Sequence, residues 1–296
     1  MVDELRRRIE AIVRQVLSEA LASESQELDL SREYSARQMM LVANWKMNGS
    51  MDFARRYATS LQPVADDVEI VLCPPTVLLT VLYQSLDPAL HVKLGVQDLY
   101  HEPNGAFTGQ HSASMLKDAG AVYAIVGHSE RRSMFGDTDY EVNLKLKAAL
   151  QNNLRPILCV GESQEERKAG ATYRILRAQL TSALGDLSSP LPDPDHVVIA
   201  YEPLWAIGTG QTASAEQAQD AMAFIRDRIS ELFSWSFAQR MRILYGGSAN
   251  PDNALELASM DDVDGFLVGG AGLDPNKLMN MAEAVTQAAH MGVASA

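Results

Sequence analysis

The sequence contains little cysteine: Cys73 and Cys159 are its two cysteines in 296 residues. Each stands in a short apolar run typical of a buried strand. We therefore expect two buried, free thiols in a reducing cytoplasm rather than a disulfide framework. The sequence also lacks any Cys and His cluster with the spacing of a zinc site, so we expect no metal centre.

Long apolar runs and positive charge are scarce as well. No run approaches the ~20 apolar residues that cross a bilayer, and no secretory signal core is present. The chain has 25 Lys and Arg against 38 Asp and Glu, for a formal net charge of −13. This balance argues against nucleic acids and anionic membranes as partners. A small anionic substrate stays open, because a few lysines and backbone N–H groups make a single pocket locally positive.

Residues 1–22 repeat apolar side chains at steps of three and four, which predicts one apolar face of a helix. The stripe consists of Val2, Leu5, Ile9, Ile12, Val13, Val16, Ala20 and Leu21. Residues 23–38 are polar and without a period, as in a linker. We therefore divide the chain into an amphipathic helix (1–22), a linker (23–38), a folded domain (39–289) and a tail (290–296).

From Met39 onward, eight short apolar runs alternate with helical patterns. The runs are Met40–Ala43, Ile70–Leu72, Val92–Val96, Val122–Val126, Ile157–Val160, Val197–Ala200, Ile243–Tyr245 and Phe266–Val268. Clear helical patterns cover Asp52–Leu61, Asp139–Asn152, Glu216–Leu232 and Asn253–Ala258. Continuously apolar runs suit parallel strands buried on both faces, and eight strand–helix units over about 250 residues predict a (β/α)₈ barrel. A doubly wound open sheet is the alternative, but no GxGxxG opens a first unit.

Reactive polar side chains follow directly after these runs, at the strand ends where barrels place their active sites. Asn44 and Lys46 follow the first run, His128 the fourth and Glu202 the sixth. Glu202 is suited to take a proton from carbon, and His128 to polarise a carbonyl or shuttle protons. Lys46 would stabilise a developing enediolate, with Asn44 donating to the same oxygen. Taken singly, each also fits an ordinary role, such as a buried histidine, a surface lysine or, for Glu130, a salt bridge.

Glycines dominate the ends of the last two runs. Gly246-Gly247-Ser248 and Gly269-Gly270 expose consecutive backbone N–H groups, which suits a phosphate, although taken alone they are more typical of two tight turns. After Glu202, the segment 203–213 carries Gly208 and Gly210. It reads either as a lid that closes over a ligand or as an ordinary strand-to-helix connection.

Eight motifs along the chain carry a family resemblance. In order they are Ala43-Asn44-Trp45-Lys46-Met47-Asn48, Gly105-Ala106-Phe107-Thr108-Gly109, Gly127-His128-Ser129-Glu130-Arg131-Arg132, Cys159-Val160-Gly161-Glu162, Ala200-Tyr201-Glu202-Pro203, Trp205–Gly210, Tyr245-Gly246-Gly247-Ser248 and Leu267-Val268-Gly269-Gly270-Ala271. Together the motifs resemble the triosephosphate isomerases, from about Met39 to Ala289. The resemblance implies a cofactor-free barrel enzyme of glycolysis and gluconeogenesis. It would interconvert dihydroxyacetone phosphate and D-glyceraldehyde 3-phosphate.

The resemblance also implies a role for each residue. Glu202 would be the base that moves a proton between C1 and C2, and His128 a neutral imidazole. Lys46 and Asn44 would stabilise the enediolate oxygens, and Glu130 would position Lys46. The implied phosphate ligands are Gly208, Ser248, Gly269 and Gly270. The implied lid comprises Pro203, Leu204, Trp205, Ala206, Ile207, Gly208, Thr209, Gly210, Gln211, Thr212 and Ala213. The implied dimer loop, which enters a neighbouring subunit of a homodimer, comprises Phe107, Thr108 and Gly109.

The chain departs from the family pattern at three positions. Gln110 stands where a Glu is usual, Gln211 where a Lys is usual, and Gly272 where a Ser is usual. We expect a weaker dimer contact at Gln110 and altered lid kinetics at Gln211. At Gly272 we expect phosphate binding that persists, more weakly, through the backbone donors.

Two other functions stay open for the barrel. One is another sugar-phosphate enzyme, an epimerase or an aldolase, although Glu202 stands on the sixth run where an aldolase would need a Schiff-base lysine. The other is a non-catalytic scaffold tethered by the N-terminal helix. The presence of all four reactive side chains argues against it.

Residues 1–22 have competing interpretations, because the family fold needs nothing before Met39. They would form a helix packed on the barrel or a short coiled coil, or else a docking helix. A short amphipathic helix on a tether resembles the peptides that carry enzymes into bacterial microcompartments, with a shell or cargo protein as partner and the lumen as location. Asp3, Glu4, Glu10 and Glu19 argue against a mitochondrial presequence.

Overall fold

The computed structural model describes residues 37–187, 192–207 and 212–295, which belong to one compact unit. The expected helix at 1–22, most of the expected linker and lid residues 208–211 lie outside the described residues. Within the described ranges, no helix is both long and apolar enough to cross a membrane.

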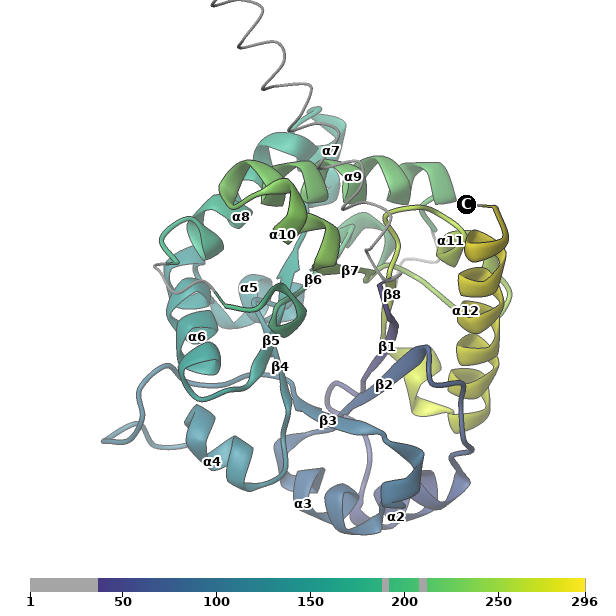
Figure 1. Ribbon diagram of the computed structural model, residues 1–296. Coiled ribbons are helices and arrows are strands. Elements are labelled where there is room, and N and C mark those ends of the chain that lie inside the picture. Colours follow the sequence, from purple (N-terminus) through teal and green to yellow (C-terminus); the bar gives the residue numbers. More distant parts are fainter. Residues whose placement is uncertain (1–36, 188–191, 208–211, 296) are drawn as a thin grey trace, which may run out of the picture. The chain divides into compact units, whose positions relative to one another are not determined.

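Eight parallel strands in the described chain close into a barrel in sequence order, with β1 paired to both β2 and β8. They are β1 (Met39–Asn44), β2 (Val68–Cys73), β3 (Lys93–Val96), β4 (Tyr123–Val126), β5 (Arg155–Val160), β6 (Val198–Tyr201), β7 (Arg242–Tyr245) and β8 (Gly265–Val268). Helices surround this ring of strands (Figure 1). The predicted (β/α)₈ barrel is confirmed, and each strand begins and ends within two residues of its predicted run.

Helices follow the strands as predicted. The α-helices are α2 (Met51–Ser60), α3 (Thr76–Ser85), α4 (Ala113–Asp118), α5 (Ser129–Phe135), α6 (Asp139–Gln151), α7 (Gln164–Lys168), α8 (Thr172–Leu184), α9 (Ala215–Leu232), α10 (Trp235–Arg240), α11 (Ala254–Ala258) and α12 (Pro275–Ser295). Short 3₁₀ helices are η1 (Pro88–Leu90), η2 (Pro194–His196), η3 (Leu204–Ala206) and η4 (Gly270–Leu273). Capping boxes fix where two of the long helices begin: Thr138 with Glu141 at α6, and Ser214 with Gln217 at α9.

The described ends of the chain differ from the expected boundaries. Arg37 Nε donates to Asp264 Oδ1 at 2.5 Å, and Gln38 Nε2 donates to the carbonyl of Asp66 at 2.9 Å. The last two residues of the expected linker are therefore hydrogen-bonded to the barrel. At the other end, α12 continues through Ser295, so residues 290–295 are helical turns rather than a separate tail.

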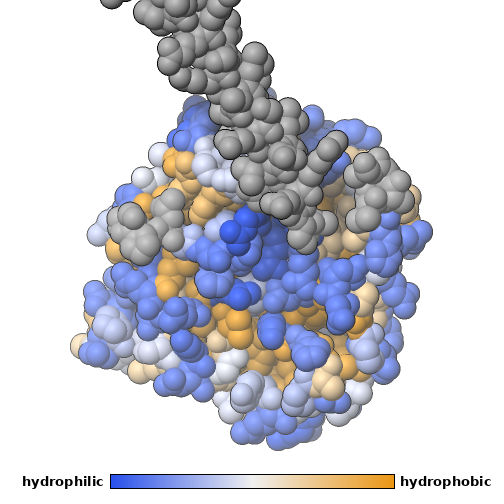
Figure 2. Space-filling view, viewed as in Figure 1, coloured by the Kyte–Doolittle hydropathy of each residue, from blue (hydrophilic) through white to orange (hydrophobic). Residues whose placement is uncertain are grey.

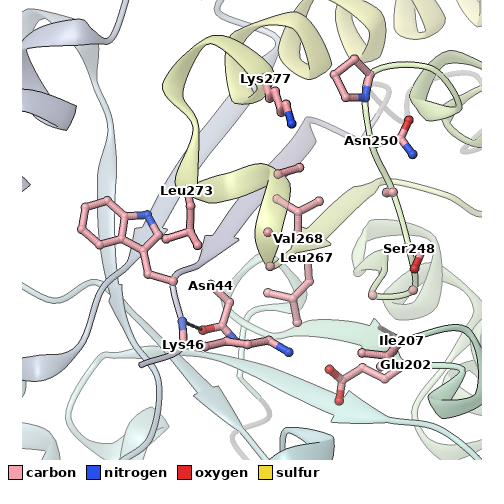
Figure 3. Close-up of a pocket in the computed structure, with 18 of the residues that line it drawn as sticks. Asn44, Lys46, Glu202, Ile207, Ser248, Asn250, Leu267, Val268, Leu273 and Lys277 are labelled. Carbon is pink, nitrogen blue, oxygen red and sulfur yellow. Dashed lines mark hydrogen bonds between the residues drawn. The ribbon is translucent and has the colours of Figure 1, made fainter. Parts of the chain in front are cut away.

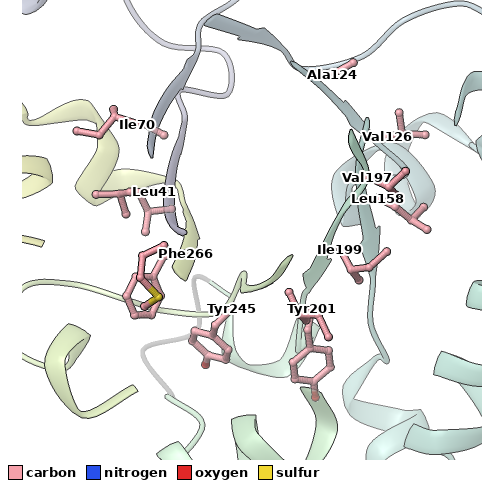
Figure 4. Close-up of a cluster of buried hydrophobic side chains, with 14 of the residues drawn as sticks. Leu41, Ile70, Ala124, Val126, Leu158, Val197, Ile199, Tyr201, Tyr245 and Phe266 are labelled. Atoms are coloured by element: carbon pink, nitrogen blue, oxygen red, sulfur yellow. The ribbon is translucent and has the colours of Figure 1, made fainter. Parts of the chain in front are cut away.

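Side chains alternate along each strand between the barrel interior and the layer beneath the helices. The interior cluster consists of Met40, Val42, Val71, Cys73, Tyr123, Ile125, Ile157, Cys159, Val198, Ala200, Leu244 and Leu267. Alternate residues such as Leu41, Val126 and Phe266 belong to the outer layer (Figure 4). Both layers are buried, which explains why the strands are continuously apolar. By contrast, hydrophilic residues cover much of the molecular face in Figure 2. Both cysteines are buried and free, as predicted.

A polar layer closes the interior at the N-terminal ends of the strands. Glu69 Oε2 accepts the hydroxyl of Tyr123 at 2.7 Å and Nη1 of Arg242 at 2.6 Å. The Tyr123 oxygen in turn accepts Nη2 of Arg242 at 3.0 Å and Nη1 of Arg155 at 3.2 Å. Burial raises the pKa of Glu69. The charge of Arg242 and the hydrogen bonds outweigh burial, so the pKa lies below its ordinary value.

Replacing Arg242 with Met should leave the Glu69 carboxylate buried without its cation. We expect the free energy of unfolding to fall by about 3–5 kcal/mol, measured by urea denaturation at pH 7. The double variant Glu69→Leu/Arg242→Met should recover most of that loss, because it removes both buried charges. If the single variant is as stable as the parent chain, the pair does not hold the barrel closed.

The same ion pair gives stability a pH dependence. Because the pKa of Glu69 is lowered on folding, its contribution is complete above the ordinary glutamate value of about 4.3. It is lost as the pH falls through the lowered value in the folded chain. The parent chain should therefore lose more stability on acidification than Glu69→Leu/Arg242→Met.

Candidate active site

The alternation of side chains along each strand, which fills the barrel interior, also directs the candidate site residues inward. Val42 of β1 points inward, so Asn44, two residues on, points inward at the C-terminal end. Ala200 of β6 likewise places Glu202 inward. Asn44 and Glu202 retain only 5% and 2% exposure, so both polar groups lie inside the protein. Register thus brings together residues 158 positions apart in sequence.

Glycines at neighbouring strand ends leave the space that these side chains occupy. A Cβ on Gly161 would lie 1.8 Å from the carbonyl oxygen of Glu202, and one on Gly246 would lie 3.0 Å from its Cγ. A Cβ on Gly269 would lie 3.3 Å from Cε of Lys46. Any larger residue at Gly161 would therefore displace the backbone that carries the carboxylate.

A pocket of about 910 Å³ opens above these strand ends. Its lining includes Asn44, Lys46, His128, Glu202, Ile207, Ser248, Gly269 and Gly270. Figure 3 shows Lys46 and Glu202 reaching toward each other from the ends of β1 and β6, with Ser248 on the Glu202 side of the pocket. The four predicted reactive side chains thus line one cavity.

Lys46 is held in place along its whole length. Its backbone has φ +50°, a strained conformation for a lysine. Its N–H donates to Asn44 Oδ1 at 3.0 Å, and its carbonyl accepts Nε2 of Gln97 at 2.8 Å. Its Nζ lies 2.7 Å from Glu130 Oε1. Gln97 also donates to the carbonyl of Cys73 at 2.9 Å. The side-chain amide of Gln97 therefore holds the strained backbone at Lys46 in place. No role for Gln97 was predicted from the sequence.

His128 caps the N-terminus of α5. Its Nδ1 accepts the N–H of Glu130 at 3.3 Å, and its Nε2 lies 3.0 Å from Glu202 Oε1. Acceptance at Nδ1 requires a lone pair there, which places the ring proton on Nε2. Burial lowers the pKa of His128, but the carboxylate of Glu202 opposes burial and carries the pKa above its ordinary value.

Glu202 uses both carboxylate oxygens. Oε1 faces His128, and Oε2 accepts the N–H of Ser129 at 2.8 Å. Burial raises the pKa of Glu202, but His128, Ser129 and Lys46 together lower it below its ordinary value. The buried carboxylate is therefore ionised at neutral pH, as a base must be.

The glycine turns lie beside the reactive side chains. Gly269 and Gly270 line the pocket at the end of β8. Ser248 lines it too, but its N–H and hydroxyl donate to the carbonyl of Ala206 at 3.2 and 2.7 Å. Both Ser248 donors must leave that carbonyl before they bind a ligand. Gly208, the fourth predicted phosphate ligand, lies outside the described residues.

Hydrogen bonds anchor the first end of the predicted lid. At the first end, buried Glu162 accepts Nε1 of Trp205 at 3.0 Å and the hydroxyl of Tyr201 at 3.1 Å. At the second end, the Tyr245 hydroxyl lies near the backbone of Ala213, but it is buried without a hydrogen-bond partner among the described residues. Burial raises the pKa of Tyr245 to about 12, against a smaller lowering by that backbone. Glu162 stood inside a sequence motif without an assigned role, because its partner Trp205 lies 43 residues away.

The predicted dimer loop lies on the surface. Phe107 is 38% exposed and packs on Tyr100, with ring centroids 4.7 Å apart. Gly109 and Gln110 line a second pocket of about 350 Å³ that also contacts Lys46. Met47, on the rim of that pocket, is 95% exposed. An apolar side chain this exposed beside a cavity suits a contact with another chain.

Groups of three or more His, Cys, Asp or Glu arranged for a metal ion are absent from the described part of the chain.

Comparison with known proteins shows the family to which the barrel belongs. The family model for triosephosphate isomerase matches residues 39–285. The chain belongs to the triosephosphate isomerase family.

Several triosephosphate isomerases are close in sequence. That of Alkaliphilus metalliredigens is 44% identical over 248 residues, which cover 83% of this chain and 98% of the relative. That of Hydrogenovibrio crunogenus is 45% identical over 252 residues, covering 84% and 98%. That of Citrifermentans bemidjiense is 47% identical over 240 residues, covering 80% and 94%. The match to the triosephosphate isomerase model starts at Met39, so residues 1–38 lie outside it.

Gly272, one of the departures from the triosephosphate isomerase pattern, has a packing reason. A Cβ there would lie 2.7 Å from Cβ of Ala43 in β1. Its N–H donates to the carbonyl of Gly269 at 2.9 Å, and its carbonyl accepts the Tyr57 hydroxyl at 2.8 Å. The methyl group of Ala43 in β1 therefore fills the space that a side chain at position 272 would need.

Gly272→Ser alone should overpack this contact and lower the free energy of unfolding by about 1–3 kcal/mol. Adding Ala43→Gly should relieve the clash, so the double variant should be more stable than the sum of the two single changes predicts. Urea denaturation of the four chains measures the coupling. Simple additivity would show that the two positions do not compete for the same space.

Proposed function

We propose that the 910 Å³ pocket is where this chain interconverts dihydroxyacetone phosphate and D-glyceraldehyde 3-phosphate, the reaction of its family. One observation carries the proposal: a base, a proton donor and a fixed cation converge beside two glycine turns. The carboxylate of Glu202 stands at the end of β6, where an aldolase would need a lysine. This arrangement favours proton transfer over Schiff-base chemistry.

Glu202 is the base in this proposal. It removes a proton from C1 of dihydroxyacetone phosphate, and the electrons form the C1–C2 double bond of an enediolate with negative charge on O2. Return of the proton from Glu202 to C2 gives the aldehyde, provided that a proton moves from O1 to O2. Because Oε1 and Oε2 are occupied by His128 and Ser129, the carboxylate must release these donors to reach the carbon.

His128 and Lys46 act on the oxygens. The ring proton on Nε2 of His128 is available to O1 and O2 in turn, once Glu202 moves away. That movement also removes the contact that raises the histidine pKa. Burial and the charge of Lys46 then favour the neutral imidazole. Lys46, strained and held by Gln97 and Glu130, keeps its charge beside the enediolate at little reorganisation cost.

The glycine turns and the lid complete the site. Gly269 and Gly270 offer backbone N–H groups to the phosphate dianion, and Ser248 and Gly208 would add donors as the lid closes. Release of Ser248 from Ala206 couples phosphate binding to lid movement. Exclusion of water by the lid, residues 203–213, protects the enediolate from losing phosphate.

Glu202→Gln should fold normally and lose turnover by about 10²–10⁴-fold, because the amide cannot accept the proton. A coupled assay on glyceraldehyde 3-phosphate measures the rate, and circular dichroism checks the fold. Glu216→Gln, an exposed change on α9, is the matched control and should keep the parent rate. If Glu202→Gln keeps a turnover close to that of the parent chain, Glu202 is not the catalytic base.

We also propose that two chains form a homodimer. The partner's residues 107–109 would enter the 350 Å³ pocket beside Lys46 and cover Met47. The support is the exposed Met47 on the rim of that pocket and the exposed Phe107 loop. Gln110 lines the same pocket, so the amide in place of a carboxylate would lie within the interface.

Met47→Glu should convert the dimer to single chains at micromolar concentration, because it buries a charge in an apolar contact. Light scattering after size-exclusion chromatography measures the mass. Tyr140→Glu, at an exposed aromatic residue on α6, should leave the mass unchanged. A parent chain that is already monomeric, or a Met47→Glu chain that stays dimeric, contradicts the proposed interface.

We propose further that residues 1–22 are a docking helix and residues 23–36 its tether, because Arg37 and Gln38 are hydrogen-bonded to the barrel. The support is their amphipathic pattern and their position before the family match. The partner would be a microcompartment shell or cargo protein, and the location a reducing cytoplasm or a microcompartment lumen within it. The buried free thiols fit such a compartment.

Deleting residues 1–36 should leave turnover intact and abolish co-assembly with shell proteins. Residues 1–36 fused to a fluorescent protein should in turn recruit it to shells, scored by co-purification. The matched control carries Ile9→Lys and Val13→Lys, which break the apolar face. A truncated chain without activity, or recruitment that survives both lysines, contradicts the docking role.

A further inference from the structure

The pocket extends well beyond the reactive side chains. Its volume of about 910 Å³ lies near the upper end of the ~300–1,000 Å³ range of ligand sites, whereas a triose phosphate is a very small ligand. The outer part is lined by Asn250, Asp252, Leu273, Lys277 and Asn280. None of these residues has a part in the proposed chemistry.

Lys277 stands out among these outer residues. It lies in the first turn of α12, directly after the η4 turn that begins at Gly270. Its backbone N–H points to Oδ1 of Asp274 at 3.4 Å, which fixes the turn. Figure 3 shows its side chain directed from α12 toward the pocket.

Lys277 has no ion-pair partner in the part of the chain that the structure describes. Among the described residues, no carboxylate lies within ion-pair distance of its amine, whereas Lys46, the other lysine of the lining, is paired with Glu130 at 2.7 Å. Of the two lysines that line the pocket, Lys277 is therefore the one whose charge is available to attract an anion from solution.

An anion approaching this chain meets a mostly repulsive surface. The formal net charge is −13, and Asp252 lines the pocket on the loop after β7. A dianion would be repelled on that side and attracted on the α12 side. The attractive side leads directly to Gly270 and Gly269. A local cation at a pocket mouth raises the association rate of an opposite charge, and salt screens the effect.

We propose that Lys277 is a substrate-capture residue, which attracts the phosphate dianion of the incoming triose phosphate and delivers it to the turn at Gly269 and Gly270. The inference rests on the proposed isomerase function and adds the step before it. Lys277 acts on encounter and not on the enediolate, so its removal lowers kcat/KM and leaves kcat unchanged.

The test is the isomerase rate of Lys277→Gln and Lys277→Glu on glyceraldehyde 3-phosphate, at about 10 mM and about 500 mM ionic strength. We expect kcat/KM at low salt to fall about two- to fivefold for the Gln variant and about tenfold for the Glu variant. At high salt, where the Debye length is a few ångströms, both should approach the parent value. Lys93→Gln and Lys93→Glu, at the start of β3 and the opposite end of the barrel, make the same change in net charge and should keep the parent kcat/KM.

Three outcomes would overturn the inference. If the Lys277 and Lys93 variants lose kcat/KM equally at low salt, net charge and not the pocket mouth is responsible. If Lys277→Gln lowers kcat at both salt concentrations, the lysine contacts the bound substrate during chemistry. If the parent chain shows no turnover, the isomerase function itself fails and the capture role fails with it, a result distinct from a parent chain that is active and indifferent to Lys277.

Discussion

The ionised carboxylate of Glu202, buried at the end of β6, is the group on which the rest of the site depends. Burial alone would protonate it. The N–H of Ser129 and the ring of His128 keep it charged, and both belong to the start of α5. The base is therefore stabilised by the same turn that carries the proton donor, so their positions cannot vary independently.

Barrel closure makes this arrangement possible. Alternation along the strands sends Asn44 and Glu202 inward, and glycine at Gly161, Gly246 and Gly269 keeps the neighbouring strand ends empty. The opposite end of the interior is filled instead, by the buried pair of Glu69 and Arg242 with its tyrosine and arginine neighbours. One end of the barrel thus provides rigidity and the other provides space.

The barrel and the reactive residues were predictable because their signals are local. Short apolar runs marked all eight strands to within two residues, and Lys46, His128 and Glu202 stood immediately after such runs. The supporting contacts were not predictable. Glu162 with Trp205, Gln97 with the carbonyl of Lys46, and Ala43 against Gly272 join residues far apart in sequence. No pattern in one segment reveals them.

The central claim is that proton transfer through an enediolate takes place at Glu202. The most direct measurement is the isomerisation of dihydroxyacetone phosphate in D₂O, followed by NMR. Exchange of the proton on Glu202 with solvent competes with its return to C2, so part of the glyceraldehyde 3-phosphate formed should carry deuterium at C2 and the rest hydrogen, with little release of inorganic phosphate. A Glu202→Gln chain that forms the product at the parent rate and with the same deuterium fraction would contradict the account, because the proton would then be carried by another group.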